Sequence, residues 1–335
     1  MAVATKVAEI KENLVLGTEW DKTFPKNEKV DHEKVTFVNH FGITLAADKY
    51  SPKGATGKLA GIAVCGPFGG VKEQASGLYA QEMASRGFVT VVFDPSFMGE
   101  SGGAPRHMAS ADLNTEDFLA AVDYLRTLDN VDSERVGIIG ICGWGGLALN
   151  TAQLDTRIKA TAVMTMYDLS RSQMKGYFDS EDTKEQRIEK RKAMMAGRDQ
   201  VAQTGEFSFA GGLPPVGVLP DEAPDFLKQY VDYYKRLERG YHPRSVGGNE
   251  GGFVGCTSIS NTKLLAYADE IESAVLVCHG ENAHSRYMGE DAFKLLKGDN
   301  KELMIIPGAT HCDLYDNYDY IPFDKLQRFF EDNLK

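Results

Sequence analysis

The sequence predicts an α/β protein, with an eight-stranded, mostly parallel sheet, helices on both faces of the sheet, and an inserted helical cap. From about Lys34 onward, short runs rich in β-branched residues alternate with amphipathic helical segments, which is the pattern of a sheet covered on both faces. Two strand-like runs follow one another directly at the start, which predicts an antiparallel beginning. The segment 169–265 breaks the alternation and therefore indicates an insertion.

The predicted strands are short apolar runs, and the predicted helices lie between them. In the helix expected over 114–128, Phe118, Ala121, Val122 and Leu125 show the i, i+3, i+4, i+7 spacing of a buried helix face. Pro322 suits the first turn of the last helix. The strands are expected at 34–40, 43–50, 59–65, 88–94, 135–141, 158–167, 273–279 and 301–307, and the other helices at 72–86, 145–153, 288–297 and 322–334.

Three parts of the chain follow from this alternation. Residues 1–31 are expected to form an N-terminal helical extension, 32–168 and 266–335 the α/β core, and 169–265 the cap. Ligands bind beyond the C-terminal ends of strands in such sheets, so an insertion leaving one of those ends should cover the pocket. The alternative is an insertion that only stabilises the protein or mediates a homodimer.

Composition narrows the class of partner and the location. The net charge of -11 opposes binding to nucleic acid or to an anionic membrane, because both require a basic surface. The N-terminus lacks the continuous apolar region of a secretory signal, and no segment is long and apolar enough to span a membrane. The five cysteines are odd in number, which favours reduced thiols and a cytoplasmic protein. Without clustered Cys and His ligands we expect no metal site and no cofactor, and the partner is a small-molecule substrate.

The most informative segment is a β-run that turns into a glycine-rich helix start, Arg135-Val-Gly-Ile-Ile-Gly-Ile-Cys142-Gly-Trp-Gly-Gly146. A nucleophile on such a sharp turn is exposed above the sheet, and the N-terminus of the following helix stabilises its anion. The pKa of a cysteine thiol falls at helix N-termini and beside a protonated histidine. We therefore expect Cys142 to be the nucleophile, with a thiolate available at neutral pH.

The other parts of a catalytic site come from three loops. His311 follows the last strand run and is the expected partner of Cys142. The loop Cys65-Gly-Pro-Phe-Gly-Gly70 should donate a backbone N–H to an oxyanion, and because Pro67 has none, we assign that role to Phe68, with Gly143 as second donor and Gly69 as the alternative to Phe68. Ser101 lies in a glycine-rich turn and is interpreted as a turn residue rather than a nucleophile.

These segments together resemble a known family. GPFGG-x-KEQ, DPSFMGESGG, GICGWGG, HGE and PGATH, in this order and spacing, are similar to the α/β-hydrolase superfamily, and within it to dienelactone hydrolase-like proteins, which also place cysteine at the elbow. The resemblance covers about 32–335 and implies the α/β-hydrolase fold, with nucleophile, acid and histidine in that chain order. It is weakest over 169–265, so the lactone substrates of the family are not carried over.

Two departures from the family pattern concern Trp144 and the acid. Trp144 stands where a small residue is expected, and a frame shifted by two would put tryptophan at the nucleophile position of an inert protein. We prefer Cys142 because the β-run leads directly into it, and we assign Trp144 and Tyr167 to the substrate pocket. Ala283 occupies the usual place of the acid; Asp168, directly after the sixth strand, is the first substitute, and Glu281, which is equally well read as a turn residue, is the second.

The sequence thus predicts a hydrolase of a small ester, lactone or thioester that works through an acyl-cysteine intermediate. Cys142 attacks, His311 moves the proton, Asp168 orients His311, and the N–H groups of Phe68 and Gly143 hold the oxyanion. Aromatic residues of the cap suit an apolar or aromatic substrate. The alternatives are a non-hydrolytic lyase or small-molecule binding protein with a degenerate triad, which Trp144 and Ala283 favour, and a structural or partner-binding role of the capped domain.

Overall fold

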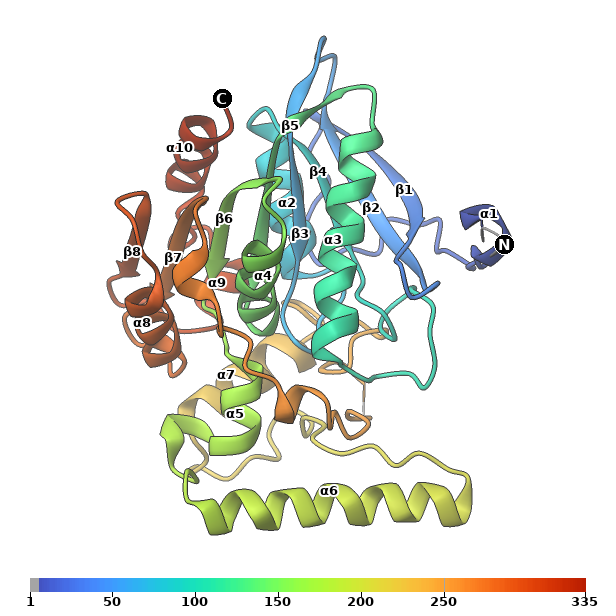
Figure 1. Ribbon diagram of the computed structural model, residues 1–335, viewed down its shortest axis with the longest axis vertical. Coiled ribbons are helices and arrows are strands. Elements are labelled where there is room, and N and C mark those ends of the chain that lie inside the picture. Colours follow the sequence, from blue (N-terminus) through green and yellow to red (C-terminus); the bar gives the residue numbers. More distant parts are fainter. Residues whose placement is uncertain (1–5, 250) are drawn as a thin grey trace.

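The computed structural model describes residues 6–249 and 251–335, and its described strands form one eight-stranded sheet (Figure 1). The order across the sheet is β1-β2-β4-β3-β5-β6-β7-β8. Strand β2 pairs antiparallel with both β1 and β4, and the remaining neighbours are parallel. The predicted fold is therefore confirmed. The strands are β1 (Val30–Val38), β2 (Thr44–Pro52), β3 (Leu59–Cys65), β4 (Val89–Phe93), β5 (Val131–Ile141), β6 (Ile158–Met164), β7 (Ala274–Gly280) and β8 (Lys301–Ile306).

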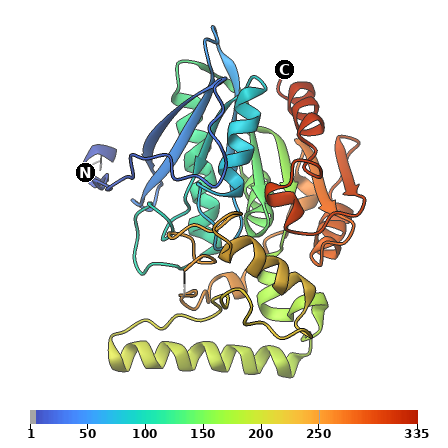
Figure 2. The ribbon, with the colours of Figure 1, turned by 180° about the vertical axis from the view of Figure 1, so that it is seen from behind.

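Helices cover both faces of the sheet. On the face turned to the viewer in Figure 1, α3 (Ala111–Thr127) packs against α4 (Gly143–Leu154), with α8 (Arg286–Leu295) beside β7 and β8. On the face shown in Figure 2, α2 (Ala75–Ser85) contacts α9 (Asp313–Asp316) and α10 (Phe323–Asn333). All of these helices except the short α9, which was not expected, agree with the expected ranges to within a few residues, because their apolar faces are buried against the sheet.

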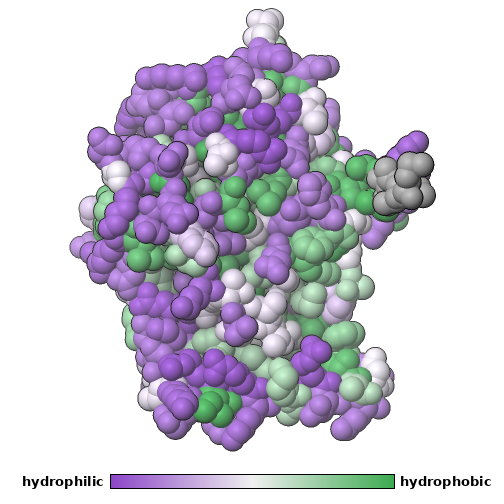
Figure 3. Space-filling model, viewed as in Figure 1, coloured by the Kyte–Doolittle hydropathy of each residue, from purple (hydrophilic) through white to green (hydrophobic). Residues whose placement is uncertain are grey.

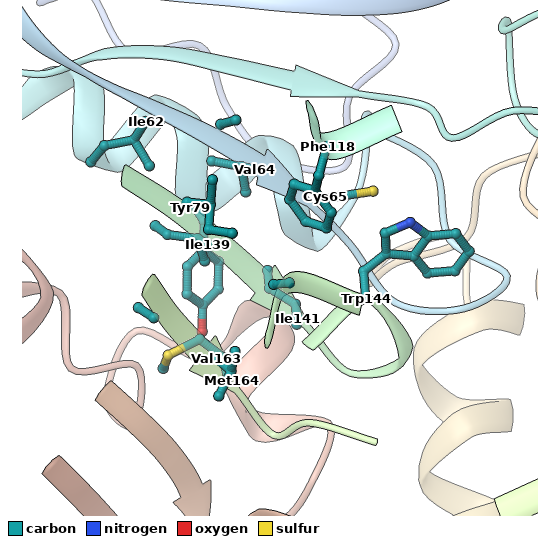
Figure 4. Close-up of a cluster of buried hydrophobic side chains, with 14 of the residues drawn as sticks. Ile62, Val64, Cys65, Tyr79, Phe118, Ile139, Ile141, Trp144, Val163 and Met164 are labelled. Atoms are coloured by element: carbon teal, nitrogen blue, oxygen red, sulfur yellow. The ribbon is translucent and has the colours of Figure 1, made fainter. Parts of the chain in front are cut away.

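The core lies between these layers and is densest around the central strands (Figure 4). Every residue of β4 is buried, and so are the last six of β5. Strands of a parallel sheet covered on both faces read as continuous apolar runs, which is why their positions are predictable from sequence. The close-up shows side chains of β3, β5 and β6 meeting those of the covering helices: Ile62, Val64, Ile139, Ile141, Val163, Met164, Tyr79 and Phe118.

The N-terminal segment corrects the prediction of a helical extension over 1–31. Helix α1 spans only Val7–Ile10, and the chain from 12 to 29 is irregular; residues 1–5 lie outside the described residues. The irregular stretch is held by side chains of the core, since the N–H of Glu12 donates to Thr44 Oγ1 (2.8 Å) and the N–H of Gly17 donates to Glu100 Oε1 (2.5 Å). Backbone N–H groups that bond to the core in this way are not available to a helix.

The insertion between β6 and β7 lies beyond the C-terminal ends of the parallel strands (Figures 1 and 2). Helices α5 (Leu169–Lys175) and α7 (Asp225–Lys235) lie next to the sheet, whereas the 21-residue α6 (Lys184–Thr204) forms the outer edge and buries none of its residues. A capping box at Thr183 and a left-handed Gly205 define the two ends of α6. Three short 3₁₀ turns, η1 (Tyr177–Asp179), η2 (Ile259–Asn261) and η3 (Ala268–Glu270), complete the insertion.

The surface in the view of Figure 1 is mainly hydrophilic, with apolar residues interspersed over the insertion (Figure 3). Several large apolar side chains of the insertion are exposed, among them Phe207, Phe209 and Val218. Among the described residues, no helix combines the length and apolar character that crossing a membrane requires.

Candidate active site

Cys142 lies at the turn between β5 and α4 in a backbone conformation that few residues adopt. Its φ is 54° and its ψ is -121°, a strained region for a residue with a side chain. The turn is held by its own backbone: the N–H of Cys142 donates to the carbonyl of Met164 (2.9 Å), and the carbonyl of Cys142 accepts from the N–H groups of Gly145 (2.9 Å) and Tyr167 (2.8 Å). Such over-determined strain is characteristic of functional positions.

The glycines around this turn settle which residue occupies the elbow. A Cβ at Gly140 would lie 2.4 Å from the carbonyl oxygen of Trp144, and one at Gly146 would lie 2.3 Å from that of Tyr167. Helix α4 can therefore approach the sheet only where side chains are absent. Cys142 is the residue with positive φ, so the frame that puts tryptophan at the nucleophile position is wrong.

Trp144 points away from the pocket, which corrects its assignment as a pocket wall. Its side chain is fully buried and stacks on Phe68 with ring centroids 5.8 Å apart. Figure 4 shows the indole near Cys65 and Phe118, at the edge of the buried cluster. Trp144 is absent from the pocket lining, whereas Phe68, on which it stacks, belongs to that lining, so Trp144 packs behind Phe68.

A pocket of about 290 Å³ opens above Cys142. Its floor is Cys142 and the loop after β3, and most of its walls come from the insertion. Tyr167 lines it, where the sequence analysis had placed it. The lining is largely aromatic and aliphatic: Phe68, Gly69, Cys142, Tyr167, Leu169, Ser172, Gln173, Tyr177, Gly211, Leu213, Tyr230, Tyr234, Val246, Gly247 and Phe253.

Two backbone N–H groups converge on the thiol of Cys142. Those of Phe68 and Gly143 both lie close enough to lower the pKa of this thiol. The two loops come this close because Gly143 has no side chain, since a Cβ there would lie 2.7 Å from Cβ of Phe68. The structure thus brings together the two residues that the sequence analysis selected as oxyanion donors.

His311 is fully buried next to the elbow, and its ring has only hydroxyl partners among the described residues. Its Nδ1 lies 2.8 Å from Thr165 Oγ1 and 2.8 Å from Ser285 Oγ, and its Nε2 lies 3.0 Å from the hydroxyl of Tyr315. Burial without a carboxylate partner keeps the pKa of His311 well below its ordinary value. The imidazole is therefore neutral at neutral pH.

Neither candidate acid reaches His311. The carboxylate of Asp168 accepts the N–H of Arg171 (2.9 Å) and caps helix α5, and that of Glu281 accepts the N–H of Gly308 (2.9 Å). The assignment of Asp168 as the orienting acid is wrong because β6 already ends at Met164, and Asp168 instead becomes the N-cap residue of α5. Ser285 and Thr165 occupy the place beside Nδ1 that a triad gives to its acid.

Two tyrosines complete the surroundings of the thiol. The hydroxyls of Tyr315 and Tyr230 both lie close enough to the thiol of Cys142 to lower its pKa. Tyr230 is one of the cap aromatics that were expected to suit a substrate, whereas Tyr315 was missed by the sequence analysis. The Tyr230 hydroxyl also lies 3.0 Å from that of Tyr167, and both of these phenols contact Nε2 of His284. The only sequence signal for Tyr315 is its position four residues after His311, one helical turn along the chain.

The thiol of Cys142 is neutral in this environment. Burial raises its pKa to about 11, although the hydrogen bonds from Tyr315, Phe68, Gly143 and Tyr230 lower it. The expectation of a thiolate at neutral pH is wrong because desolvation outweighs the helix N-terminus and because His311 carries no charge. The other four cysteines are also buried and free.

Comparison with known proteins places the chain in a family. A family model described as PET hydrolase-like matches residues 25–176. An uncharacterized protein of Pseudomonas aeruginosa, PA2218, is 51% identical over 324 residues, covering 96% of this chain and 86% of that protein. The uncharacterized protein YcjY of Escherichia coli is 31% identical over 319 residues, covering 90% and 99%.

Comparison with solved structures supports the relationship to PA2218 and the fold. The crystal structure of PA2218 superposes with a TM-score of 0.92 at 50% identity, covering 97% of this chain and all of that one. The α/β hydrolase GrgF from Penicillium sp. sh18 superposes with a TM-score of 0.71 at 18% identity, covering 91% and 99%. The chain has the α/β-hydrolase fold, and it belongs to one family with PA2218 and YcjY. Within the superfamily, the narrower resemblance to dienelactone hydrolases stays a prediction.

The loop that carries Phe68 rests on a buried lysine. The ammonium of Lys72 lies 2.7 Å from Glu73, 2.8 Å from Asp94 and 2.6 Å from Glu100, and its side chain is fully buried. These three carboxylates lie within 4.8 Å of one another and are the set of described residues that could hold a metal ion. Lys72 already supplies a cation at their centre, and the surrounding carboxylates raise its pKa, so it stays charged.

The same charge network reaches the N-terminal segment and the insertion. Arg244, from the insertion, lies 3.0 Å from Glu73 and 2.6 Å from Asp21 of the N-terminal segment. Lys34 of β1 lies 2.6 Å from Glu100. The loop that carries Phe68 is thus tied by charges to parts of the chain more than a hundred residues apart.

Proposed function

We propose that this protein hydrolyses a small ester, lactone or thioester through an acyl intermediate on Cys142. The observation that carries the proposal is the convergence at one atom: the thiol of Cys142 sits on a strained elbow, opens into the pocket, and receives the N–H groups of Phe68 and Gly143. Donors fixed around a nucleophile are suited to stabilise the oxyanion that forms when that nucleophile attacks a carbonyl.

Relatives support a hydrolase and favour thioesters within the proposed range. The thiohydrolase aneE of Aspergillus aculeatus is 27% identical over 243 residues, which cover 65% of this chain and 73% of that protein. The acyltransferase drtE of Aspergillus calidoustus is 31% identical over 132 residues, which cover 39% of this chain. Hydrolysis and acyl transfer share an acyl-enzyme intermediate and differ in whether water or another nucleophile removes the acyl group.

The reaction proceeds in two halves. The sulfur of Cys142 attacks the carbonyl carbon while its proton moves toward His311, and the developing oxyanion is held by Phe68 and Gly143. Collapse breaks the bond to the leaving alcohol or thiol, which takes up the proton. Water then attacks the acyl-cysteine with His311 again accepting a proton, and release of the carboxylic acid restores the thiol.

The pocket lining indicates the acyl part of the substrate. Side chains of Phe253, Leu213 and Val246 face the space above Cys142, and the polar groups there are mostly tyrosine hydroxyls. A cavity of about 290 Å³ limits the bound portion to a small group. We therefore propose an apolar or aromatic acyl group with few charges.

The alternative, a non-hydrolytic binding protein or lyase with a degenerate triad, draws on one specific observation. Within residues 6–249 and 251–335, His311 has no carboxylate partner of the kind that usually stabilises a charged imidazole. The two proposals differ in whether a covalent acyl group appears on Cys142.

The test compares two cysteine variants on p-nitrophenyl butyrate and on a butyryl thioester of N-acetylcysteamine. Cys142→Ala should abolish turnover of both, and peptide mass spectrometry of the quenched parent enzyme should find butyryl on the Cys142 peptide. Cys256→Ala is the control, because Cys256 is buried away from the pocket and should leave turnover unchanged. Turnover that survives Cys142→Ala, or an acyl group on another residue, would contradict the proposal.

A further inference from the structure

The nucleophile and its base are linked through a third side chain. The Nε2 of His311, the atom that would accept the thiol proton, faces the hydroxyl of Tyr315 at 3.0 Å, and the same hydroxyl lies close enough to the thiol of Cys142 to lower its pKa. Phenol oxygens both donate and accept, so a single hydroxyl can receive one proton and release another.

The position of Tyr315 is fixed by its surroundings. Its side chain is fully buried, and its ring packs edge-on against Tyr233 (4.9 Å between centroids) and against His311 (5.3 Å). The short helix α9 that carries it is held to α2 because the hydroxyl of Tyr79 donates to the carbonyl of Leu314 (2.7 Å). These contacts hold the phenol in place before substrate binds. A bridging water between the Cys142 sulfur and the His311 imidazole is therefore not needed.

We propose that Tyr315 is a catalytic residue that passes the thiol proton of Cys142 to Nε2 of His311. The inference rests on the proposed function, because it assigns the proton path of the same acyl transfer. It departs from a direct Cys–His pair, in which Nε2 itself contacts the sulfur.

The protons balance along this path. As sulfur bonds to the carbonyl carbon, the S–H proton moves to the Tyr315 oxygen while the phenolic proton moves to His311 Nε2, leaving the phenol neutral. Proton transfer toward Nε2 requires the neutral imidazole of His311 to carry its proton on Nδ1. There the N–H can donate a hydrogen bond to the hydroxyl oxygen of Thr165 or Ser285. When the adduct collapses, the proton on Nε2 returns through Tyr315 to the leaving atom. In the second half, water takes the place of the thiol as proton donor.

Tyr230 provides a matched comparison because its hydroxyl lies near the thiol but, among the described residues, makes no hydrogen bond to His311, although its ring packs edge-on against that of His311 (5.5 Å between centroids). Its hydroxyl continues to Tyr167 and His284 instead. Tyr315→Phe and Tyr230→Phe therefore each remove one hydroxyl that lies near the sulfur of Cys142. Only Tyr315→Phe also removes the hydrogen-bond partner of His311 Nε2.

The experiment measures acylation directly, as the burst of p-nitrophenolate from p-nitrophenyl butyrate. Tyr315→Phe should slow the burst by about 100-fold or more, which is the range of a general acid–base contribution. Combining it with His311→Gln should cause little further loss, since residues on one proton path act as a unit, whereas the effects of Tyr230→Phe and His311→Gln should add. A proton inventory in mixtures of light and heavy water should be curved for the parent enzyme, because two protons move together, and linear for Tyr315→Phe.

The outcomes separate the relay from the function on which it rests. If Cys142→Ala keeps the burst, the proposed function fails. If Cys142→Ala is inactive but Tyr315→Phe acylates within about threefold of the parent, or its effect adds fully to that of His311→Gln, the relay alone is overturned. Should Tyr315→Phe fail to fold, the proton inventory of the parent enzyme tests the relay instead. A linear inventory would overturn the relay, because the relay moves two protons together.

Discussion

Cys142 and His311 differ in charge state from the ion pair that activates many cysteine nucleophiles. In such pairs a histidinium lowers the pKa of the thiol to give a stable thiolate before substrate binds. Here burial favours the neutral form of both groups, because it raises the pKa of the Cys142 thiol and lowers that of the His311 imidazole. The thiol must therefore lose its proton during attack, as a serine hydroxyl does in a Ser–His enzyme.

This charge state predicts the pH dependence of the reaction. His311 must be unprotonated to accept, and because its pKa is lowered well below 6.5, activity should be complete at neutral pH and lost only as the pH falls through that lowered value. The thiol pKa of about 11 places the other limit far on the alkaline side. We expect kcat/KM to be constant between about pH 7 and pH 9. Ultraviolet thiolate absorbance, taken as the difference from Cys142→Ala, should be absent at pH 7; a thiolate signal there would show an ion pair instead.

At the scale of elements, Asp168 shows how one residue serves the start of a helix rather than the site. Asparagine caps helices as well as aspartate does, so Asp168→Asn should preserve both stability and turnover, whereas Asp168→Ala should cost about 1 kcal/mol of stability with turnover unchanged. Ser285→Ala should instead lower turnover, because Nδ1 of His311 loses one of its two hydroxyl partners. Urea unfolding and steady-state kinetics on the three variants check this. Loss of turnover in Asp168→Asn with the fold intact would restore Asp168 to the site.

The elements themselves were largely predictable from sequence, because their apolar residues form short continuous runs, which are buried in the central strands. The run 59–65 coincides with β3 to the residue, and 301–307 exceeds β8 by only one. The N-terminal segment was not predictable, because side chains of Thr44 and Glu100, distant in sequence, hold its backbone. Long-range contacts of this kind leave no local pattern.

The candidate site was predictable where backbone geometry determines it. A strand that turns into a glycine-rich helix start predicts a nucleophile elbow. In the loop after β3, Pro67 has no backbone N–H, which predicts that Phe68 is the N–H donor. Which side chain surrounds His311 was not predictable: Thr165, Ser285 and Tyr315 contribute only hydroxyls, and hydroxyl residues are too common along the chain to mark a site. The prediction that Trp144 lines the substrate pocket was wrong for a related reason. The sequence shows the position of Trp144 on the turn but not the direction of its side chain.

At the scale of the whole molecule, the charge network around Lys72 joins three parts of the chain that the sequence analysis treated as separate. The N-terminal segment contributes Asp21, the core contributes Lys34 and Glu100, and the insertion contributes Arg244. The insertion is thus attached to the loop that carries Phe68 by charge as well as by the aromatic walls of the pocket.

Removing the central cation should therefore destabilise the protein as a whole. Lys72→Met leaves three buried carboxylates facing one another, and breaking a buried pair in this way typically costs about 3–5 kcal/mol. Urea unfolding measures the loss. Lys192→Met is the matched control, because Lys192 pairs only with Glu189 on the exposed face of α6, and its midpoint should not change. Equal midpoints for the two variants would show that the network does not hold the domain together.

The neutral, enclosed thiol of Cys142 also has a bearing on oxidative chemistry. Peroxides attack thiolates far faster than thiols, and susceptibility to sulfenic acid formation follows both thiolate character and exposure. With its proton retained and only a small fraction of its surface open to the pocket, Cys142 meets neither condition. A nucleophile of this kind gains its reactivity only in the presence of a bound carbonyl, so it can persist in surroundings where a preformed thiolate would be converted to sulfinate and lost.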